Sequence, residues 1–337
     1  MKCDIIIPVW NQLSFTKDCI DSIRKNTPGE YGLIVIDNAS GEETVNYLEG
    51  LKASGELPLR LIRNSENLGF VRAVNQGMTA SEAPFLCLLN NDTIVTKDWL
   101  KEMIAVADSS ADIGIVNPSS NNLGQKPADG EPVDLYAEKI RRLSGRSVEL
   151  GAAIGFCMLI KRELIRKIGL FDEIYGMGNF EDTDFSRKAV KEGYRCVRAC
   201  GAYVYHRESS SFGKVKTFDE DFNRNKEIFE FRWGKPKRIA YILDLYDVNI
   251  LKRLEMDSIK LARDGNWVWF FAKDEVKMPV HSNITMVTAD KNNFYMNTAF
   301  KILTKKKRFS EIFVGGQKFW KFLDALSFIH KAKVRYY

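Results

Sequence analysis

Three acidic residues are concentrated in the short segment FEDTDF, shortly after two glycines. Glu181, Asp182 and Asp184 follow Gly176 and Gly178 at the expected start of a helix. Acidic side chains are favoured at a helix N-terminus, but capping accounts for only about one of the three. A carboxylate beside a substrate hydroxyl can act as general base while that oxygen attacks an electrophilic carbon. Neighbouring helix residues point in different directions, so Glu181 and Asp182 should differ in role, and either could face the acceptor.

A second group of residues suits a divalent cation. Asp92 follows the apolar run FLCLL after two amides, Asn90 and Asn91. Mg²⁺ and Mn²⁺ complete their coordination with water and phosphate oxygens, so one carboxylate suits an ion that also holds a diphosphate. His206 ends the run AYVYH and could add a neutral imidazole. The competing interpretations are an Asp that caps the following turn and a structural histidine at a strand end.

Further polar residues suit a nucleotide. Asp37 and Asn38 pair a carboxylate with an amide at the end of YGLIVID, which suits the donors and acceptors of a base or ribose, although an Asx turn is the alternative. Arg72 and Asn75 lie three residues apart and should face the same side of a helix. An arginine in the first turn of a helix would attract a diphosphate, whereas solvated surface charge is the competing explanation.

These residues require elements that bring them together. Four short apolar runs have the composition of buried parallel strands: CDIIIPV, YGLIVID, LRLIR and FLCLL. Helices are expected between them, over 13–26, 42–54 and 70–80. Strand–helix–strand units give right-handed crossovers on a parallel sheet, whose ligand crevice lies outside the carboxyl ends of the strands. The polar residues at these four ends run from Pro8 to Asn11, Asp37 to Asn38, Arg63 to Asn64, and Asn90 to Asp92. This exceeds what turns require, so we expect a site along this edge.

The rest of the chain continues the alternation of strands and helices. A helix over 97–108, the strand IGIVN and an irregular excursion over 118–147 are followed by GAAIGFCMLIKRELIRKIGLFDE, a strand and a short helix. The turn and helix of YGMGNFEDTDFSRKAVKEGY then precede the strand RCVRACGAYVYH. Gly, Pro and clustered bases in RWGKPKR predict a boundary near 235, with domains over 1–235 and 236–337. In the second, NWVWFFA, NITMVTA and EIFVGG predict strands of a small α/β subdomain.

Composition excludes several classes of protein. The 337 residues are 45% apolar and 28% charged, which is typical of a globular protein. The uncharged run over residues 150–160 is far shorter than the roughly 20 residues that cross a bilayer. Six cysteines without a CxxC pair and a start without a leader pattern indicate a cytoplasmic protein. The basic charge belongs to residues 237–337, with 19 Lys and Arg against 10 Asp and Glu, a net +9; residues 1–236 have 31 against 34, a net −3.

Taken in order, the motifs resemble family 2 of the inverting glycosyltransferases, which have the GT-A fold, and especially its rhamnosyltransferase-like members. The matching segments are IIIPVWN, VIDNAS, NSENLGFVRAVNQG, LLNNDT, GAAIGFCMLIKRE, FDE with NFEDTDFSRKAVKEGY, and HRESSSFG. The resemblance implies a GT-A type, Rossmann-like α/β fold with a mainly parallel sheet flanked by helices, and a smaller C-terminal α/β or helical extension.

The resemblance also implies a reaction. A non-processive, inverting enzyme would move a sugar from a UDP- or dTDP-sugar to a hydroxyl of a glycan or lipid-linked acceptor in cell-surface polysaccharide synthesis, with Mg²⁺ or Mn²⁺ bound. Asp92 would hold the metal with help from His206, Asp182 would be the base, and Glu181 would orient acceptor or base. The donor-binding residues would be Pro8, Asn11, Asp37, Asn38, Asn67, Gly69, Arg72, Asn75, Asn90 and Asn91.

The chain departs from the family pattern at two positions. Asn90 stands where many members have the first aspartate of Asp-x-Asp, which should lower metal affinity. Phe229 stands where the Gln-x-x-Arg-Trp motif of processive polymerases has its glutamine, so one sugar per encounter is expected. A rival class, the sugar-1-phosphate nucleotidyltransferases, would carry a Gly-rich basic loop after the first strand, and PVWNQLSF has neither glycine nor base. A catalytically silent nucleotide-sugar or glycan-binding module is the other alternative.

The basic C-terminal region has its own pattern. The segment QKFWKFLDALSFIHKAKVRYY predicts one amphipathic helix, with an apolar side made of Phe319, Phe322, Leu323, Leu326 and Ile329. Packing against the catalytic domain is the commoner fate of such a side. The alternative is peripheral contact with an anionic membrane at the inner face, near a lipid-linked acceptor. No nucleic-acid partner is expected.

Overall fold

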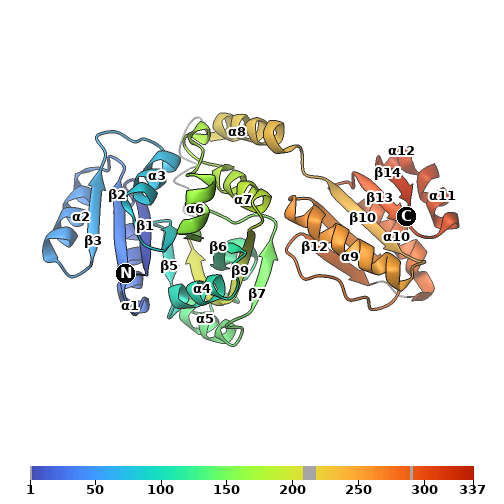
Figure 1. The fold of residues 1–337 in the computed structure, drawn as a ribbon, viewed down its shortest axis with the longest axis horizontal. Coiled ribbons are helices and arrows are strands. Elements are labelled where there is room, and N and C mark those ends of the chain that lie inside the picture. The colour runs from blue at the N-terminus through green and yellow to red at the C-terminus, as the bar shows by residue number, and fades with distance from the viewer. Residues whose placement is uncertain (1, 208–217, 289–290) are drawn as a thin grey trace. The chain divides into compact units, whose positions relative to one another are not determined.

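The computed structural model describes residues 2–207, 218–288 and 291–337. They form two compact units, residues 1–148 with 152–232 and residues 149–151 with 233–337. Figure 1 shows the helices and strands of each. Of the motif HRESSSFG, only His206 and Arg207 belong to the described residues. Within these ranges no helix is long and apolar enough to span a membrane.

Nine strands of the described chain form the larger sheet (Figure 1). Their bounds are β1 Cys3–Val9, β2 Tyr31–Asp37, β3 Leu59–Arg63, β4 Phe85–Leu89, β5 Thr93–Val95, β6 Ile113–Ser119, β7 Ser147–Leu150, β8 Cys157–Lys161 and β9 Arg195–His206. The strand order is β3-β2-β1-β4-β8-β6-β9-β5, and β7 pairs with β9. Strands β1 to β4 are parallel, whereas β8 is antiparallel to β4 and β6, and β5 is antiparallel to β9. The predicted mainly parallel sheet is confirmed.

Helices cover both faces of this sheet because its central strands are apolar on both sides. Their bounds are α1 Leu13–Asn26, α2 Glu42–Ser54, α3 Phe70–Ala80, α4 Trp99–Asp108, α5 Val133–Arg141, α6 Arg162–Ile168, α7 Glu181–Lys191 and α8 Phe218–Trp233. Ile5 and Ile7 pack with α1 and α4 on one face. On the other face α3 approaches so closely that a Cβ on Gly77 would lie 2.4 Å from Ile6 Cγ2. The first three helices were predicted with these bounds, but α5 lies within the expected excursion and α8 was not predicted.

The second unit is a smaller α/β layer, in agreement with the predicted C-terminal extension. Its strands are β10 Arg238–Leu243, β11 Trp267–Ala272, β12 Ile284–Thr288, β13 Glu311–Val314 and β14 Lys333–Tyr336, in the order β12-β11-β10-β13-β14. All its strand pairs are parallel. Its helices are α9 Val248–Arg263, α10 Phe294–Thr304, α11 Gln317–Ala325 and α12 Ser327–His330. Helix α9 covers one face of the sheet, and α10 and α11 cover the other.

The prediction of one amphipathic helix near the C-terminus was wrong. Helix α11 ends at Ala325, α12 is only one turn long, and residues 333–336 form β14 beside β13. Phe319 and Leu323 are buried in the core of the unit, whereas Phe322 is 48% exposed. The buried His330 closes the break, because its Nε2 lies 2.9 Å from the Leu323 carbonyl and its Nδ1 accepts from the Ala332 N–H at 3.1 Å. Strand pairing therefore overrides the helical pattern.

Candidate active site

The carboxyl ends of β1, β2 and β3 meet at one edge, as their parallel order requires. The Asn38 N–H donates to the Val9 carbonyl at 2.8 Å, and the Asn64 N–H donates to the Asp37 carbonyl at 2.9 Å. Asp37 is 1% exposed, and its two carboxylate oxygens accept from the Ser40 N–H at 2.9 Å and from Arg63 Nε at 3.2 Å. Asp37 is therefore held rigidly at the end of β2.

Asn38 shapes the neighbouring turn. Its Oδ1 accepts from Asn64 Nδ2 and from the Leu68 N–H, each at 3.0 Å. Its Nδ2 donates to Asn67 Oδ1 at 2.7 Å, and the same oxygen accepts from the Gly69 N–H at 2.9 Å. These bonds make Asn38 and Asn67 the framework of the turn that precedes α3.

Asn11 has a similar role one loop away. Its N–H donates to Ser40 Oγ at 2.8 Å, and its Oδ1 accepts from the Gly41 N–H at 2.7 Å. Pro8 lies within β1, in register with Ile36 of β2. The ends of β1 and β2 are thus connected by side-chain bonds as well as by the sheet.

The structure separates Arg72 from Asn75, which the sequence analysis treats as a pair. Asn75 is buried, and its amide is fully engaged by the Phe171 backbone, with bonds of 2.9 and 3.1 Å. Arg72 Nε lies 3.1 Å from Glu173 Oε2, and both side chains are more than half exposed. Such a pair contributes little to stability, so Arg72 can exchange Glu173 for another anion at small cost.

Asp92 and His206 lie in direct contact. Strand β5 pairs with β9, which places His206 Nε2 2.9 Å from Asp92 Oδ1. The ring of His206 stacks on Phe156, with centroids 5.2 Å apart. The two preceding amides are used locally: the Asn90 N–H donates to the Phe156 carbonyl at 2.8 Å, and Asn91 Nδ2 donates to Thr16 Oγ1 at 2.9 Å. The predicted pairing of Asp92 with His206 is therefore realised in space.

The Asp92–His206 pair fits a divalent cation. Two neighbouring ligands of an octahedral Mg²⁺, each about 2.1 Å from the ion, lie about 3.0 Å apart, close to the observed separation. Asn122 Nδ2 lies 2.6 Å from His206 Nδ1, while Asn122 Oδ1 is buried without a hydrogen-bond partner among the described residues. Turning that amide over lets Oδ1 accept the Nδ1–H proton and frees Nε2 as a metal ligand. Since the described chain holds no group of three or more such ligands, a bound ion would draw the rest from substrate and water.

Glu181 and Asp182 sit at the start of α7 in different surroundings. Glu181 is 5% exposed, and Oε2 has no hydrogen-bond partner within the described chain. Burial, and then the charge of Asp182, raise the pKa of Glu181 to about 8. Asp182 accepts from the Gly155 N–H at 2.8 Å and from the Thr183 N–H at 2.6 Å. Burial raises the pKa of Asp182 as well, but these N–H groups oppose it. At neutral pH the raised pKa favours a proton on Glu181, whereas the two N–H groups favour the charged form of Asp182.

One turn connects these acids to Asp92 and His206. Gly155 donates to Asp182, and a Cβ at Gly155 would lie 3.7 Å from Glu181 Oε1. The next residue, Phe156, stacks on His206 and accepts from Asn90. Asn117 of β6 fixes the turn through bonds of 2.6 to 3.0 Å to the backbone of residues 154 and 157. The turn at Gly155 and Phe156 therefore contacts members of both predicted groups.

The loop before α7 is strained and held from α8. Asn179 and Phe180 both have φ of 73°, a left-handed conformation that bulky residues rarely adopt. Asn225 of α8 is fully buried, and its Nδ2 donates to the Tyr175, Gly178 and Asn179 carbonyls at 2.9, 2.8 and 3.3 Å. The ring of Phe180 also packs against two aromatic rings of α8. These contacts maintain the conformation that presents Glu181 and Asp182.

The same loop also contacts the turn that precedes α3. Gly69 has φ of +82°, and an added Cβ would lie 2.9 Å from the Gly176 carbonyl oxygen. The Val71 N–H donates to that oxygen at 3.4 Å. Only glycine at position 69 permits this approach. The turn that precedes α3 and the loop that precedes Glu181 and Asp182 are therefore positioned together.

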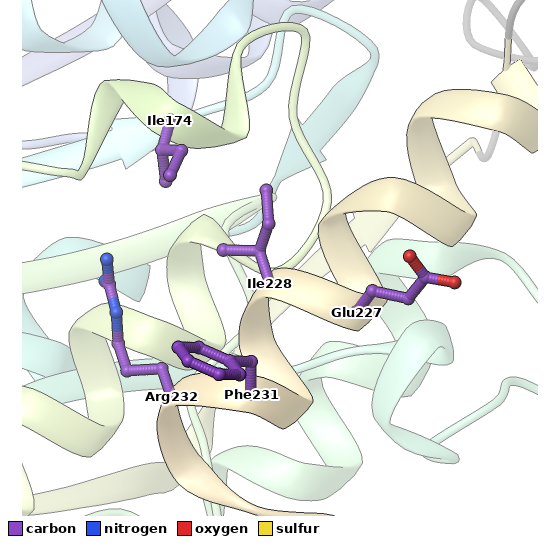
Figure 2. A pocket seen from close by; sticks show the side chains of 5 residues that line it. All are labelled: Ile174, Glu227, Ile228, Phe231 and Arg232. Atoms are coloured by element: carbon purple, nitrogen blue, oxygen red, sulfur yellow. The ribbon is translucent and has the colours of Figure 1, made fainter.

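Asp184, the third acid of the cluster, belongs to a different network. It is 1% exposed, with Lys188 Nζ at 2.9 Å and Arg232 Nη1 at 2.7 Å. Arg232 also lines an apolar hollow, in which Figure 2 shows Ile174, Ile228 and Phe231 with Glu227 pointing away. Asp184 thus anchors α8 to α7.

The residues that sequence reasoning missed are supports. Asn117, Asn122, Gly155 and Asn225 have no motif that marks them, and their partners are 27 to 84 residues away. Only the backbone fold reveals them. The segment GAAIGF contains Gly155 and Phe156 and was noted as part of a strand, but nothing in it indicated contact with the acids.

Comparison with known proteins relates the chain to a family. The model of glycosyl transferase family 2 matches residues 4–169. Protein y4gI of Sinorhizobium fredii is 27% identical over 248 residues, 68% of this chain and 27% of that protein. Glycosyltransferase YwdF of Bacillus subtilis is 27% identical over 219 residues, 61% of this chain and 74% of that protein. The chain thus spans about a quarter of the first relative and about three quarters of the second.

Solved structures with the same fold agree with this placement. TarS 1–349 of S. aureus in complex with UDP-GlcNAc has a TM-score of 0.53 at 18% identity and covers 76% of this chain and 71% of TarS 1–349. Mannosyltransferase PcManGT of Pyrobaculum calidifontis, with GDP-Man and Mn²⁺, has a TM-score of 0.50 at 17% identity and covers 63% of this chain and 59% of that one. The predicted family and its GT-A fold are confirmed: residues 4–169 match the model of glycosyl transferase family 2.

Proposed function

We propose that the protein is an inverting, non-processive glycosyltransferase that moves a sugar from a UDP- or dTDP-sugar to a hydroxyl of a glycan or lipid-linked acceptor in cell-surface polysaccharide synthesis. The observation that carries this proposal is the turn at Gly155 and Phe156, which contacts Asp182 on one side and His206, the partner of Asp92, on the other. This arrangement supports acceptor activation next to diphosphate binding, as sugar transfer requires.

The donor is proposed to lie along the ends of β1 to β4. Asp37 is buried and rigid, and is assigned to the base or ribose. Gly69, at the start of α3, leaves backbone N–H groups near the diphosphate, which a helix N-terminus favours. Arg72 is exposed and weakly paired, so it can turn to the diphosphate. The framework roles of Asn11, Asn38 and Asn67 make this edge rigid before the donor arrives.

A divalent cation is proposed at Asp92 and His206. The GDP-Man complex of PcManGT contains Mn²⁺, as does a complex of GalNAc-T7 with UDP and GalNAc. An ion held by Asp92 and His206 would neutralise charge that develops on the leaving diphosphate. With Asn at position 90 the protein supplies few ligands, so the affinity for metal should be modest without donor and higher with it.

The two acids are proposed to divide the work on the acceptor. Asp182, whose charged form is favoured by two backbone N–H groups, takes the proton from the attacking hydroxyl as the new bond to the anomeric carbon forms and the bond to the diphosphate breaks. Glu181 keeps its proton and donates a hydrogen bond that orients the acceptor or Asp182. One base and one displacement, with no covalent intermediate, invert the configuration at the anomeric carbon.

The test is nucleotide release from a panel of UDP-, dTDP- and GDP-sugars with soluble and lipid-linked acceptors, in Mg²⁺, Mn²⁺ or chelator. The configuration of the product at the anomeric carbon is read by NMR. Metal-dependent turnover of one donor, with inverted product and loss of activity in Asp92→Ala, supports the proposal. Retained configuration would refute the single displacement. Tight donor binding without turnover of any pair would instead indicate a silent binding module.

A further inference from the structure

The second unit has the topology of a ligand-binding sheet in its own right. Its five strands are all parallel in the order β12-β11-β10-β13-β14, and the helices after β10 and β13 cover opposite faces. The chain therefore leaves these adjacent strands in opposite directions, which makes a topological switch point. In open α/β sheets ligands bind in the crevice outside the carboxyl ends of the strands at such a point.

A buried carboxylate stands at this switch point. Asp244 follows β10 directly and is 7% exposed. Its Oδ1 accepts from the N–H groups of Leu245, Gly315 and Gly316 at 3.1, 3.2 and 2.9 Å. Its Oδ2 has no hydrogen-bond partner among the residues that the structure describes. A buried carboxylate oxygen without a hydrogen-bond donor is unfavourable in free energy, so we expect Oδ2 to accept from a donor that the described chain does not provide.

Two glycines after β13 bring the end of the next helix against this oxygen. Gly316 has φ of −94°, an ordinary extended value, so the backbone does not require glycine there. Glycine is required for lack of space: an added Cβ on Gly316 would lie 2.3 Å from Asp244 Oδ2, and one on Gly315 would lie 2.3 Å from the Leu245 carbonyl oxygen. The unpaired oxygen therefore faces the N-terminus of the nine-residue helix α11.

Apolar and aromatic side chains adjoin the carboxylate. Leu245 is 61% exposed, and Tyr246 and Tyr337 are partly buried and each pack against the core cluster that contains β10 residues. The hydroxyl of Tyr337 donates to the Ile242 carbonyl at 2.8 Å. A carboxylate beside an aromatic and apolar margin suits a ring with hydroxyl groups on its edge and C–H groups on its faces.

We infer that the carboxyl edge of β10 and β13 is a second binding site, which takes a sugar ring with vicinal hydroxyls. Asp244 Oδ2 is covered in the structure, so one hydroxyl donates to it after neighbouring side chains move aside, and the C–H face of the ring then lies on exposed Leu245 and on Tyr246. Such hydroxyls belong to free or glycan-borne hexoses and to the ribose of nucleosides. The site lies wholly within the second unit, so it does not depend on the transfer reaction proposed for the first.

The inference is tested by saturation-transfer NMR and calorimetry on the full chain, with a panel of hexoses and 6-deoxyhexoses in one arm and uridine, thymidine and guanosine in the other. The variant is Asp244→Asn, in which the amide oxygen keeps the three backbone bonds while an N–H₂ donor replaces the acceptor Oδ2. The matched control is Asp264→Asn, the same exchange at an exposed position at the C-terminal end of α9, before β11. Asp92→Ala reports on the first unit.

A probe that binds wild type, Asp264→Asn and Asp92→Ala alike, and binds Asp244→Asn about tenfold or more weakly, supports the inference, and the arm to which it belongs identifies the source of the ring. No binding in either arm, equal binding by Asp244→Asn, or binding lost only in Asp92→Ala would overturn it. Failure of the proposed transfer reaction would appear as absent nucleotide release and would leave this result unchanged.

Discussion

The loop that presents Glu181 and Asp182 should fail when its support on α8 is removed. In Asn225→Ala the Gly178 and Asn179 carbonyls lose the N–H donor that lies at 2.8 and 3.3 Å in the wild type, whereas the Tyr175 carbonyl keeps the Gly178 N–H at 3.0 Å. Each buried carbonyl left without a donor costs about 1–3 kcal/mol, so we expect the free energy of unfolding to fall by about 2–4 kcal/mol.

Activity should fall further than stability alone explains. Asn179 and Phe180 hold φ of 73° at an estimated cost of about 1–3 kcal/mol each, which only the surrounding contacts maintain. Without Asn225 the loop can relax at the residue that precedes Glu181. Because the proposed donor site lies at the ends of β1 to β4, kcat should drop about tenfold or more while the KM for the donor changes little.

The assay combines denaturant unfolding with initial rates of nucleotide release. Asn223→Ala, on the exposed side of the same helix, is the matched control and should leave both unchanged. Asn225→Asp turns a carboxylate oxygen toward the same carbonyls and should be worse than alanine. Wild-type kcat in a variant that has lost about 2 kcal/mol would refute the positioning role, and wild-type stability would refute the hydrogen-bond argument.

Three further results are expected. Gly69→Ala and Gly124→Ala place alanine at φ of +82° and +84°, but only the Cβ at position 69 would meet another backbone segment. We therefore expect Gly69→Ala to lose about 1–3 kcal/mol more free energy of unfolding than Gly124→Ala and to raise the KM for the donor. Equal losses in the two variants would contradict the close approach. Because folding raises the pKa of Glu181 from 4.5 to about 8, the native protein keeps a proton that the unfolded chain releases near pH 4.5. The free energy of unfolding should therefore fall as pH rises between these two values. In measurements of unfolding against pH, Glu181→Gln should flatten this fall. The second unit is basic, and Phe300 and Phe328 are exposed on it. We predict that the protein sediments with anionic but not with neutral vesicles, that salt weakens this binding, and that exchange of both residues to serine abolishes it. Binding that does not depend on lipid charge would argue against peripheral contact.

The fold of the first hundred residues could be predicted because each element carries its own signal. The apolar runs that become β1, β2 and β4 are buried on both faces, and glycine or polar residues mark the helices between them. Helix α8 and strand β14 have weaker patterns. Helix α8 buries little of its surface, and β14 is a short edge strand in which three of the four residues are exposed. Residues 333–336 form a strand because they pair with β13, although the sequence of the segment has a helical period.

The site divides in the same way. Side chains at the ends of parallel strands could be predicted together, because the topology alone brings Asp37, Asn64 and Asp92 to one edge. The contact of Asp92 with His206 depends on the antiparallel pairing of β5 with β9, which no local pattern reveals. Asn117 and Asn225 act through backbone carbonyls far away in sequence, and their residue type carries no sign of that task.

The most direct test of the central claim is to compare wild type with Asp182→Asn in both donor affinity and nucleotide release in the presence of acceptor. The variant keeps the shape of the side chain and loses its basicity. We predict unchanged donor affinity by calorimetry and a turnover about 10²–10⁴-fold lower. Turnover within tenfold of wild type, or loss of donor binding in proportion to activity, would contradict the assignment of Asp182 as the base that activates the acceptor.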